Sequence, residues 1–154
     1  MRVKRSAKNR QLMMSRFRKT DSGPELALRR ALTRAQVRFE IYPKLPGSPD
    51  VVLADTRIVV FVHGCFWHGC PTHYRAPRTK PGYWSQKLES NKARDRSASR
   101  RLRNLGWHVA TVWECSLKRN PDAVVRRLSR MGKRLPGGPV RAEVRMESTG
   151  PGAR

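Results

Sequence analysis

Apolar and polar positions follow two different periods along the chain, and the changes of period divide it into elements. Capping-type residues and a proline at 20–25 precede apolar residues at helical spacing that continue to about residue 36, which predicts an amphipathic helix. Residues 37–42 alternate as a strand does, and 50–54 and 57–62 are short apolar runs separated by Asp55 and Thr56. We expect one strand and then a β-hairpin whose second strand, apolar on both faces, is central in its sheet.

The second half of the chain predicts a helix, a strand and a closing helix. Residues 83–104 are highly charged with widely spaced apolar positions, which predicts a solvent-exposed helix stopped by Gly106. Residues 107–113 alternate again, and a short helix with proline in its first turn runs from 121 to about 130. This order of elements indicates an α/β fold with a mixed β-sheet of about four strands flanked by helices.

Composition separates a folded body from basic extensions. The chain has 154 residues, room for one core, and we expect a single domain over 20–132. Residues 1–19 are rich in Lys and Arg and predict a basic N-terminal arm, and residues 133–154 are rich in Gly, Pro and Arg and predict a disordered basic tail.

The charge favours nucleic acid as the partner. Lys and Arg number 34 against 11 Asp and Glu, a formal net charge of +23, so the surface attracts polyanions. No run approaches the roughly 18–20 apolar residues that span a bilayer, and the basic N-terminus lacks the apolar stretch of a signal peptide. We therefore expect a cytoplasmic protein that binds nucleic acid and no membrane.

The cysteines predict a metal site. An odd number, Cys65, Cys70 and Cys115, argues against a disulfide framework. With His73, they supply the three sulfurs and one imidazole of a structural tetrahedral zinc, which would staple the loop of 63–82 to the end of the last strand. His68 or His108 could replace His73 as the fourth ligand, and the alternative without zinc is three unrelated buried cysteines.

Acids and histidines gather where the predicted hairpin opens. Hairpin pairing places Asp50 beside residues 61–63, and the following loop returns His68 to the edge where His63 ends its strand. Asp95 lies one helical turn after Asn91, and Glu25 lies in the first turn of the first helix.

Acids are scarce in this chain, so an acid that lies among histidines and faces a polyanion needs a reason. A bound Mg²⁺ ion supplies one, since it takes carboxylate and phosphate oxygens as ligands. The cluster therefore indicates Mg²⁺-dependent phosphodiester hydrolysis in which a histidine is the base. Each residue also has a structural interpretation. Asp50 could be a turn-forming residue, and His63 could be a histidine of the core. Glu25 could be there because the helix dipole favours an acid in the first turn, and Asp95 could be a surface partner of arginines.

Aromatic residues in the loop indicate contact with bases. Phe66 and Trp67 lie outside any periodic apolar face, and Trp84 follows the loop. Such residues beside arginines and lysines stack on bases or wedge between them. Trp107 and Trp113 lie in an alternating strand, and we expect them in the core.

These residues together resemble a known family, the very-short-patch (VSP) repair endonucleases. The resemblance runs from about Asn9 to Leu117. Its motifs are Asp21-x2-Pro24-Glu25-Leu26, Leu45-Pro46-Gly47-x-Pro49-Asp50, the stretch FVHGCFWH from Phe61 to His68, Asn91-x3-Asp95, and Gly106-Trp107 leading to Val112-Trp113-Glu114-Cys115. It departs from the family in the order of the zinc ligands Cys70 and His73 and in Val62, where the family has threonine.

The resemblance implies a restriction-endonuclease-like fold, a structural zinc, and Mg²⁺-dependent nicking of one DNA strand 5′ to the thymine of a T·G mismatch left by deamination of 5-methylcytosine. It implies Asp50 as the central Mg²⁺ ligand and His68 as general acid/base supported by Asp95, with His63 and Glu25 completing the site. The implied wedge in the DNA stack is Phe66, Trp67 and Trp84.

The family also implies a monomeric bacterial protein associated with the nucleoid and linked to a cytosine-5 DNA methyltransferase and to mismatch repair proteins. Two other functions are compatible with the residues: a non-catalytic, zinc-stabilised DNA-binding protein, and a restriction-type nuclease that cuts matched DNA.

Overall fold

The structure is a computed structural model that describes residues 21–135. The expected arm of 1–19 and all but the first residues of the expected tail of 133–154 lie outside this range. The elements follow the expected order with two short helices added. They are α2 (Gly23–Arg34), β1 (Phe39–Ile41), β2 (Val51–Leu53), β3 (Ile58–His63), α3 (Cys65–His68), α4 (Pro81–Asn104), β4 (His108–Trp113), α5 (Glu114–Arg119) and α6 (Pro121–Arg134).

The sheet has four strands in the order β1-β2-β3-β4, with antiparallel pairs up to β3 and a parallel pair between β3 and β4. The hairpin has the expected register, since Val51 pairs with Val60 and Leu53 with Ile58. This confirms the α/β fold and the mixed sheet. Because β3 and β4 are parallel, the chain must cross over between them, and this crossover contains α3 and α4. The loop of 63–82 is the first part of the crossover and lies where β3 ends.

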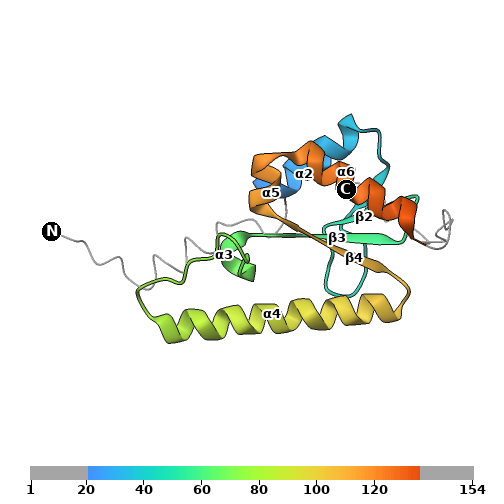
Figure 1. Ribbon diagram of the computed structural model, residues 1–154. Helices are drawn as coiled ribbons and strands as arrows, with labels where there is room; N and C mark the ends of the chain where they lie inside the picture. The colour runs from blue at the N-terminus through green and yellow to red at the C-terminus, as the bar shows by residue number, and fades with distance from the viewer. Residues whose placement is uncertain (1–20, 136–154) are drawn as a thin grey trace, which may run out of the picture.

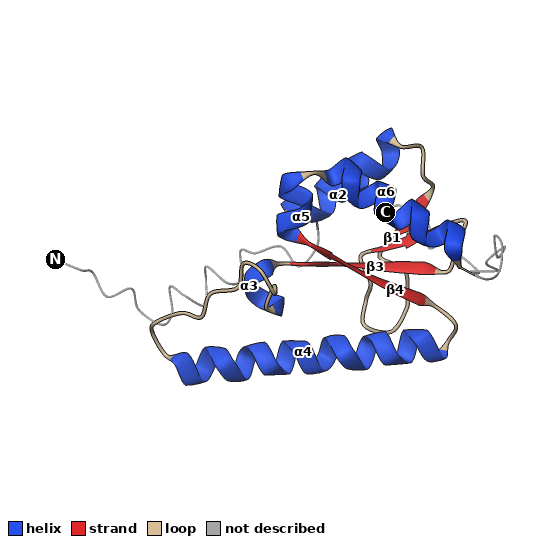
Figure 2. Ribbon diagram, in the orientation of Figure 1, coloured by secondary structure: helices blue, strands red, loops and turns tan. Residues whose placement is uncertain are grey.

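Helices cover both faces of the sheet. Helix α4 runs along one face, and α2, α5 and α6 pack on the other (Figures 1 and 2). On the α4 face Leu102 packs with Val52 and Val59, and the larger cluster lies under the other helices. Its buried members are Leu28, Ala31, Leu32, Val51, Leu53, Ile58, Val60, Ala110, Val112, Leu117, Val124, Val125 and Leu128.

Local chemistry explains where the helices begin. The Ser22 hydroxyl accepts a hydrogen bond from the Glu25 N–H, and Asn120 caps α6 in the same way by accepting from the Ala123 N–H. Each of these helices has a proline in its first turn.

Gly47 brings the turn before Asp50 onto α4. Its φ of +78° is in the left-handed region, and a Cβ built there would clash with the Cβ of Ala98. A glycine at this position therefore lets the turn lie against the helix, which closes one side of the candidate site.

Several boundaries differ from the expectation. The first strand is shorter than 37–42, and α6 runs past the expected end near residue 130 to Arg134. The loop of 63–82 contains α3, and α5 follows β4 directly. Helices of four and six residues are too short to show a period, so the pattern did not reveal them.

Trp107, directly before β4, and Trp113, its last residue, are only partly buried. Trp107 packs against the cluster under α4 as expected, whereas Trp113 meets the His63 ring edge-on with centroids 5.4 Å apart. Among the described residues, no helix has the length and apolar character to cross a membrane.

Candidate active site and metal centre

Asp50 directly precedes β2, and the neighbouring strand β3 holds both its backbone and its carboxylate. Its backbone N–H donates to the Val60 carbonyl at 3.0 Å, and the Val62 N–H donates to Asp50 Oδ2 at 2.6 Å. Burial raises the pKa of Asp50 to about 6, against the lowering effect of the Val62 hydrogen bond, and the negative charge of Glu25 raises it further. At neutral pH this carboxylate is ionised, and a positive group or cation beside it would stabilise its buried charge.

His63, His68 and Asp95 form a stacked triad beside Asp50. The two imidazoles are parallel within 6°, with centroids 3.9 Å apart. His68 Nδ1 lies 2.7 Å from Asp95 Oδ2, and His63 Nε2 lies 4.0 Å from Asp95 Oδ1. A carboxylate that accepts from Nδ1–H leaves Nε2 of His68 as the nitrogen that can take a proton.

His63 is the buried member of the triad. Its environment lowers its pKa to about 4, first through burial and then through the charge of His68, while Asp95 acts in the opposite direction. His63 is therefore neutral at physiological pH, and only His68 lies exposed enough to exchange protons with a bound substrate.

Glu25 reaches the same place from the first turn of α2. It is buried, with a relative exposure of 5%, and it lines a cleft of about 520 Å³ together with Asp50, His63, His68 and Asp95. The structure thus brings all five predicted catalytic residues to one cleft. Arg94 and Arg101 of α4 also line this cleft and supply positive charge to it.

Aromatic side chains gather next to this cleft. Phe66 meets Trp67 and Trp84 with ring centroids 5.1 and 5.3 Å away, and Asn91 fixes the loop by donating to the Trp67 carbonyl at 2.7 Å. Phe66 and Tyr83 are exposed at 37% and 53%. Tyr83 packs on Trp84 and extends the cluster, and sequence reasoning did not single it out.

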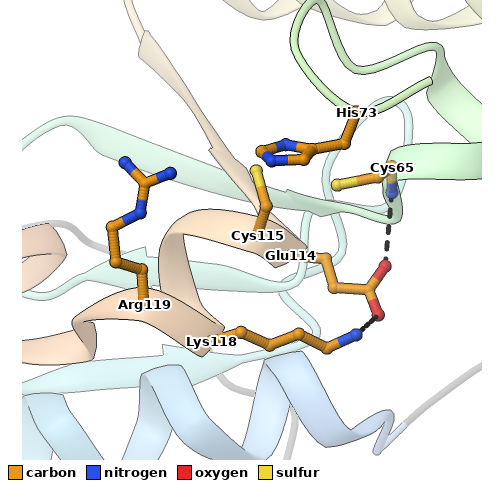
Figure 3. Close-up of a pocket in the computed structure, with 6 residues that line it drawn as sticks. All are labelled: Cys65, His73, Glu114, Cys115, Lys118 and Arg119. Atoms are coloured by element: carbon orange, nitrogen blue, oxygen red, sulfur yellow. Dashed lines mark hydrogen bonds and ion pairs between the residues drawn. The ribbon is translucent and has the colours of Figure 1, made fainter.

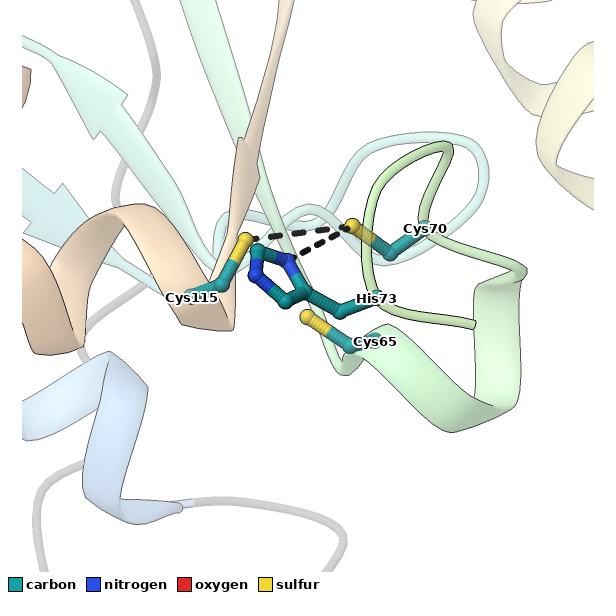
Figure 4. A group of neighbouring side chains, drawn as sticks. All are labelled: Cys65, Cys70, His73 and Cys115. Carbon is teal, nitrogen blue, oxygen red and sulfur yellow. Dashed lines mark hydrogen bonds between the residues drawn. The ribbon is translucent and has the colours of Figure 1, made fainter. Parts of the chain in front are cut away.

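The three cysteines and His73 form a second cluster. Their ligand atoms all lie within 4.8 Å of one another, and the Cys70 sulfur lies 3.8 Å from both His73 Nδ1 and the Cys115 sulfur (Figure 4). Burial alone would raise the pKa of Cys70, but hydrogen bonds from the Thr72 backbone and from His73 lower it to about 6, which favours the thiolate that binds a metal. This set can hold one metal ion.

The cluster joins α3 to the start of α5. Cys65 begins α3, and Cys115 lies in the first turn of α5. Glu114 strengthens the junction, because its carboxylate accepts from the Cys65 N–H at 3.3 Å and pairs with Lys118 at 2.8 Å (Figure 3). Of the other histidines considered as ligands, His68 belongs to the triad, and His108 starts β4, at the end of the strand opposite Cys115.

Sequence reasoning missed two residues that touch the site. Arg29 and Tyr42 both hydrogen-bond to the carboxylate of Glu25. Arg29 follows Glu25 by four residues, which is a usable helical signal. Tyr42 lies in a turn, and nothing in the local pattern marks it.

Comparison with known proteins identifies the family. The family described as DNA mismatch endonuclease Vsr matches residues 4–73, which include Asp50 and the whole FVHGCFWH stretch. The type II nicking enzyme V.XorIIP of Xanthomonas oryzae pv. oryzae is 42% identical over 114 residues, 73% of this chain and 84% of that enzyme. The chain belongs to the Vsr family of DNA endonucleases.

Two further relatives are similar to this Vsr-family chain over most of its length. The DNA mismatch endonuclease Vsr of Escherichia coli is 40% identical over 100 residues, 64% of each chain. The type II nicking enzyme V.NmeAIP of Neisseria meningitidis is 32% identical over 128 residues, 82% of this chain and 91% of that enzyme. The match spans less than two thirds of the length of the E. coli enzyme.

Proposed function

We propose that this Vsr-family endonuclease nicks one strand of duplex DNA 5′ to the thymine of a T·G mismatch, by Mg²⁺-dependent hydrolysis of the phosphodiester. The observation that carries the proposal is the cleft in which Asp50, Glu25 and the His68–Asp95 pair meet beside the aromatic cluster. The acid–histidine cluster and the aromatic cluster therefore lie next to one another, as such an enzyme requires.

The residues around Asp50 suit a hard divalent cation. The carboxylates of Asp50 and Glu25 repel one another, and among the described residues Asp50 Oδ1 has no hydrogen-bond donor. Mg²⁺ takes carboxylate and phosphate oxygens as ligands, and when bound it would polarise the phosphate and acidify water. Asp50 would hold it, and His68 Nε2 would accept the proton of the attacking water while Asp95 holds the imidazole in place.

A structural zinc at the cysteine cluster supports the same site. Three sulfurs and one imidazole match its tetrahedral ligand set. Cys65 and His68 are the first and last residues of α3. A metal ion that fixes the start of this helix would therefore also fix the position of His68, the proposed general base.

Mismatch recognition is assigned to the aromatic cluster. The partly exposed Phe66, with Trp67 and Trp84 packed around it, can enter an unstacked base step, at an unstacking cost of a few kcal/mol. A mismatched step opens more easily than a paired one, which favours T·G over T·A. We further propose that the protein acts as a monomer in the bacterial nucleoid, in a pathway with a cytosine-5 methyltransferase and mismatch repair proteins.

Nicking of labelled duplexes tests the proposal. The substrates carry one T·G mismatch in varied contexts or the matched T·A pair, with Mg²⁺ or with EDTA. Mg²⁺-dependent nicking of the T·G duplex by the wild type, lost in Asp50→Asn, is the expected result. Asp55→Asn is the matched control, because Asp55 is an exposed acid in the hairpin turn that pairs with Arg38.

Two outcomes would contradict the proposal. Equal cleavage of T·A and T·G duplexes would indicate a restriction-type nuclease on matched DNA. Tight binding with no cleavage in any context, by wild type and Asp50→Asn alike, would indicate a non-catalytic DNA-binding protein.

A further inference from the structure

The carboxylate of Glu25 is held mainly through one of its oxygens. Oε2 accepts hydrogen bonds from the Tyr42 hydroxyl at 2.8 Å, from Arg29 Nη2 at 3.3 Å and from the Asp21 N–H at 3.1 Å. Oε1 has one hydrogen-bond donor among the described residues, the Ser22 hydroxyl at 3.0 Å. An ionised carboxylate has about four lone-pair sites, so Oε1 keeps capacity for a group in the cleft.

Tyr42 and Arg29 support one another. Arg29 Nη2 donates to the Tyr42 hydroxyl at 2.6 Å, and the guanidinium carbon lies 5.0 Å from the centre of the Tyr42 ring. Arg29 Nη1 also pairs with Asp21 at 2.7 Å. The Tyr42 hydroxyl has a single proton, and the shorter of its two carboxylate contacts, 2.8 Å against 3.0 Å, is the one with Glu25.

Helix capping does not account for this arrangement. Ser22 and Glu25 already cap the start of α2, and Tyr42 lies in the turn after β1, far away in sequence. Tyr42 has a φ of +49°, a strained backbone conformation for a bulky residue, and Arg29 Nε is buried without a hydrogen-bond partner. Strain and an unpaired buried N–H are features that persist where a functional group must be held in place.

We propose that Tyr42 and Arg29 are positioning residues that hold Oε2 of Glu25, so that Oε1 stays available to the divalent cation, and its water, that Asp50 would hold. The inference rests on the proposed function, because it assigns Glu25 to the metal-dependent site. The hydroxyl and guanidinium do not touch the substrate in this scheme, and they act only through Glu25.

Tyr42→Phe is the variant that tests it, since it removes the hydroxyl and keeps the ring under Arg29. We expect the affinity for Mn²⁺ to fall about tenfold, as it does when a group that supports a metal site is lost. Electron paramagnetic resonance on protein purified without chelator measures this affinity. We expect kcat for the T·G duplex to fall by a similar factor of about ten, with KM for DNA unchanged. Arg30→Gln, an exposed arginine next to Arg29, is the control and should change neither quantity.

A double variant separates positioning from general structural support. If Tyr42 acts through Glu25, adding Tyr42→Phe to Glu25→Gln should lower kcat and Mn²⁺ affinity no further. Equal losses from Tyr42→Phe in both backgrounds, or unchanged Mn²⁺ affinity in the single variant, would overturn the inference. Mn²⁺ binding needs no cleavage, so a wild type that binds Mn²⁺ but does not nick would refute the proposed function and leave the positioning role to be decided by the Mn²⁺ result.

Discussion

At Asp50 the protein buries a carboxylate next to a second one, Glu25, in a chain with few acids. The pKa of Asp50 rises from 3.8 to about 6 on folding, first through burial. A raised pKa means that the folded state favours the protonated form, so this burial does not destabilise the protein below pH 3.8. The destabilisation grows as the pH rises from about 3.8 to about 6, and above pH 6 it levels off at about 3 kcal/mol.

Asp50→Asn should therefore stabilise the protein in Mg²⁺-free buffer. We expect the free energy of unfolding at pH 7.5 to rise by about 1–2 kcal/mol, because the amide oxygen can still accept the Val62 hydrogen bond without a buried charge. The gain should shrink as the pH is lowered to 5. Urea unfolding at both pH values measures it, and a variant less stable than wild type at pH 7.5 would contradict the account.

Among the connecting elements, the turn that ends at Asp50 depends on one glycine. Gly47→Ala would put a Cβ into contact with Ala98 of α4 and force a left-handed φ on alanine. We expect a loss of about 2 kcal/mol or more in unfolding free energy, and a fall in nicking larger than the loss of folded protein explains. Gly82→Ala is the control, since a Cβ there has nothing within 4 Å. Equal stability of the two variants would show that the turn does not need Gly47.

The junction between α3 and α5 should depend on zinc. Cys115→Ser removes the ligand that comes from α5, so we expect the zinc content, measured by atomic absorption, to fall from about one per chain towards zero and the melting temperature to drop. Nicking should fall with it, because α3 also holds His68. Full zinc content in Cys115→Ser would remove Cys115 from the ligand set.

The predictable elements are those with a clear apolar pattern or clear end signals. Two short apolar runs separated by Asp55 and Thr56 predicted β2 and β3 with the correct register, and capping residues predicted the start of α2, so the meeting of Asp50 with His63 could be predicted. The short helix α3 has no period, yet its residues carry the most specific motif of the chain. Tyr42 could not be predicted, because its link to Glu25 depends on the backbone conformation of one turn.

The whole molecule has a formal net charge of +23, so its affinity for DNA should depend strongly on the salt concentration. Arg96, Arg100 and Arg103 line a cleft of about 500 Å³ that also reaches His63 and Asp95, and the described residues offer none of them an ion pair. They are placed to contact DNA phosphates near the site.

Each of these arginines should contribute to the salt dependence of binding. Replacing Arg100 or Arg103 with Gln should reduce the slope of log K against log salt by about 1. Arg34→Gln should leave the slope unchanged, because Arg34, the last residue of α2, is already paired with Asp122 of α6. Fluorescence anisotropy over a salt series measures the slopes. Equal slopes for wild type and the α4 variants would exclude this face of α4 from DNA contact.

The central claim is that the Asp50 cleft and the aromatic cluster act together on a mismatched thymine. Its most direct test is to label each strand of a T·G duplex separately and to map the product at nucleotide resolution with the wild-type protein and Mg²⁺. The account predicts a single nick, in the thymine strand, immediately 5′ to the mismatched base. Cleavage of the guanine strand, of both strands, or of the matched T·A duplex at the same rate would contradict it.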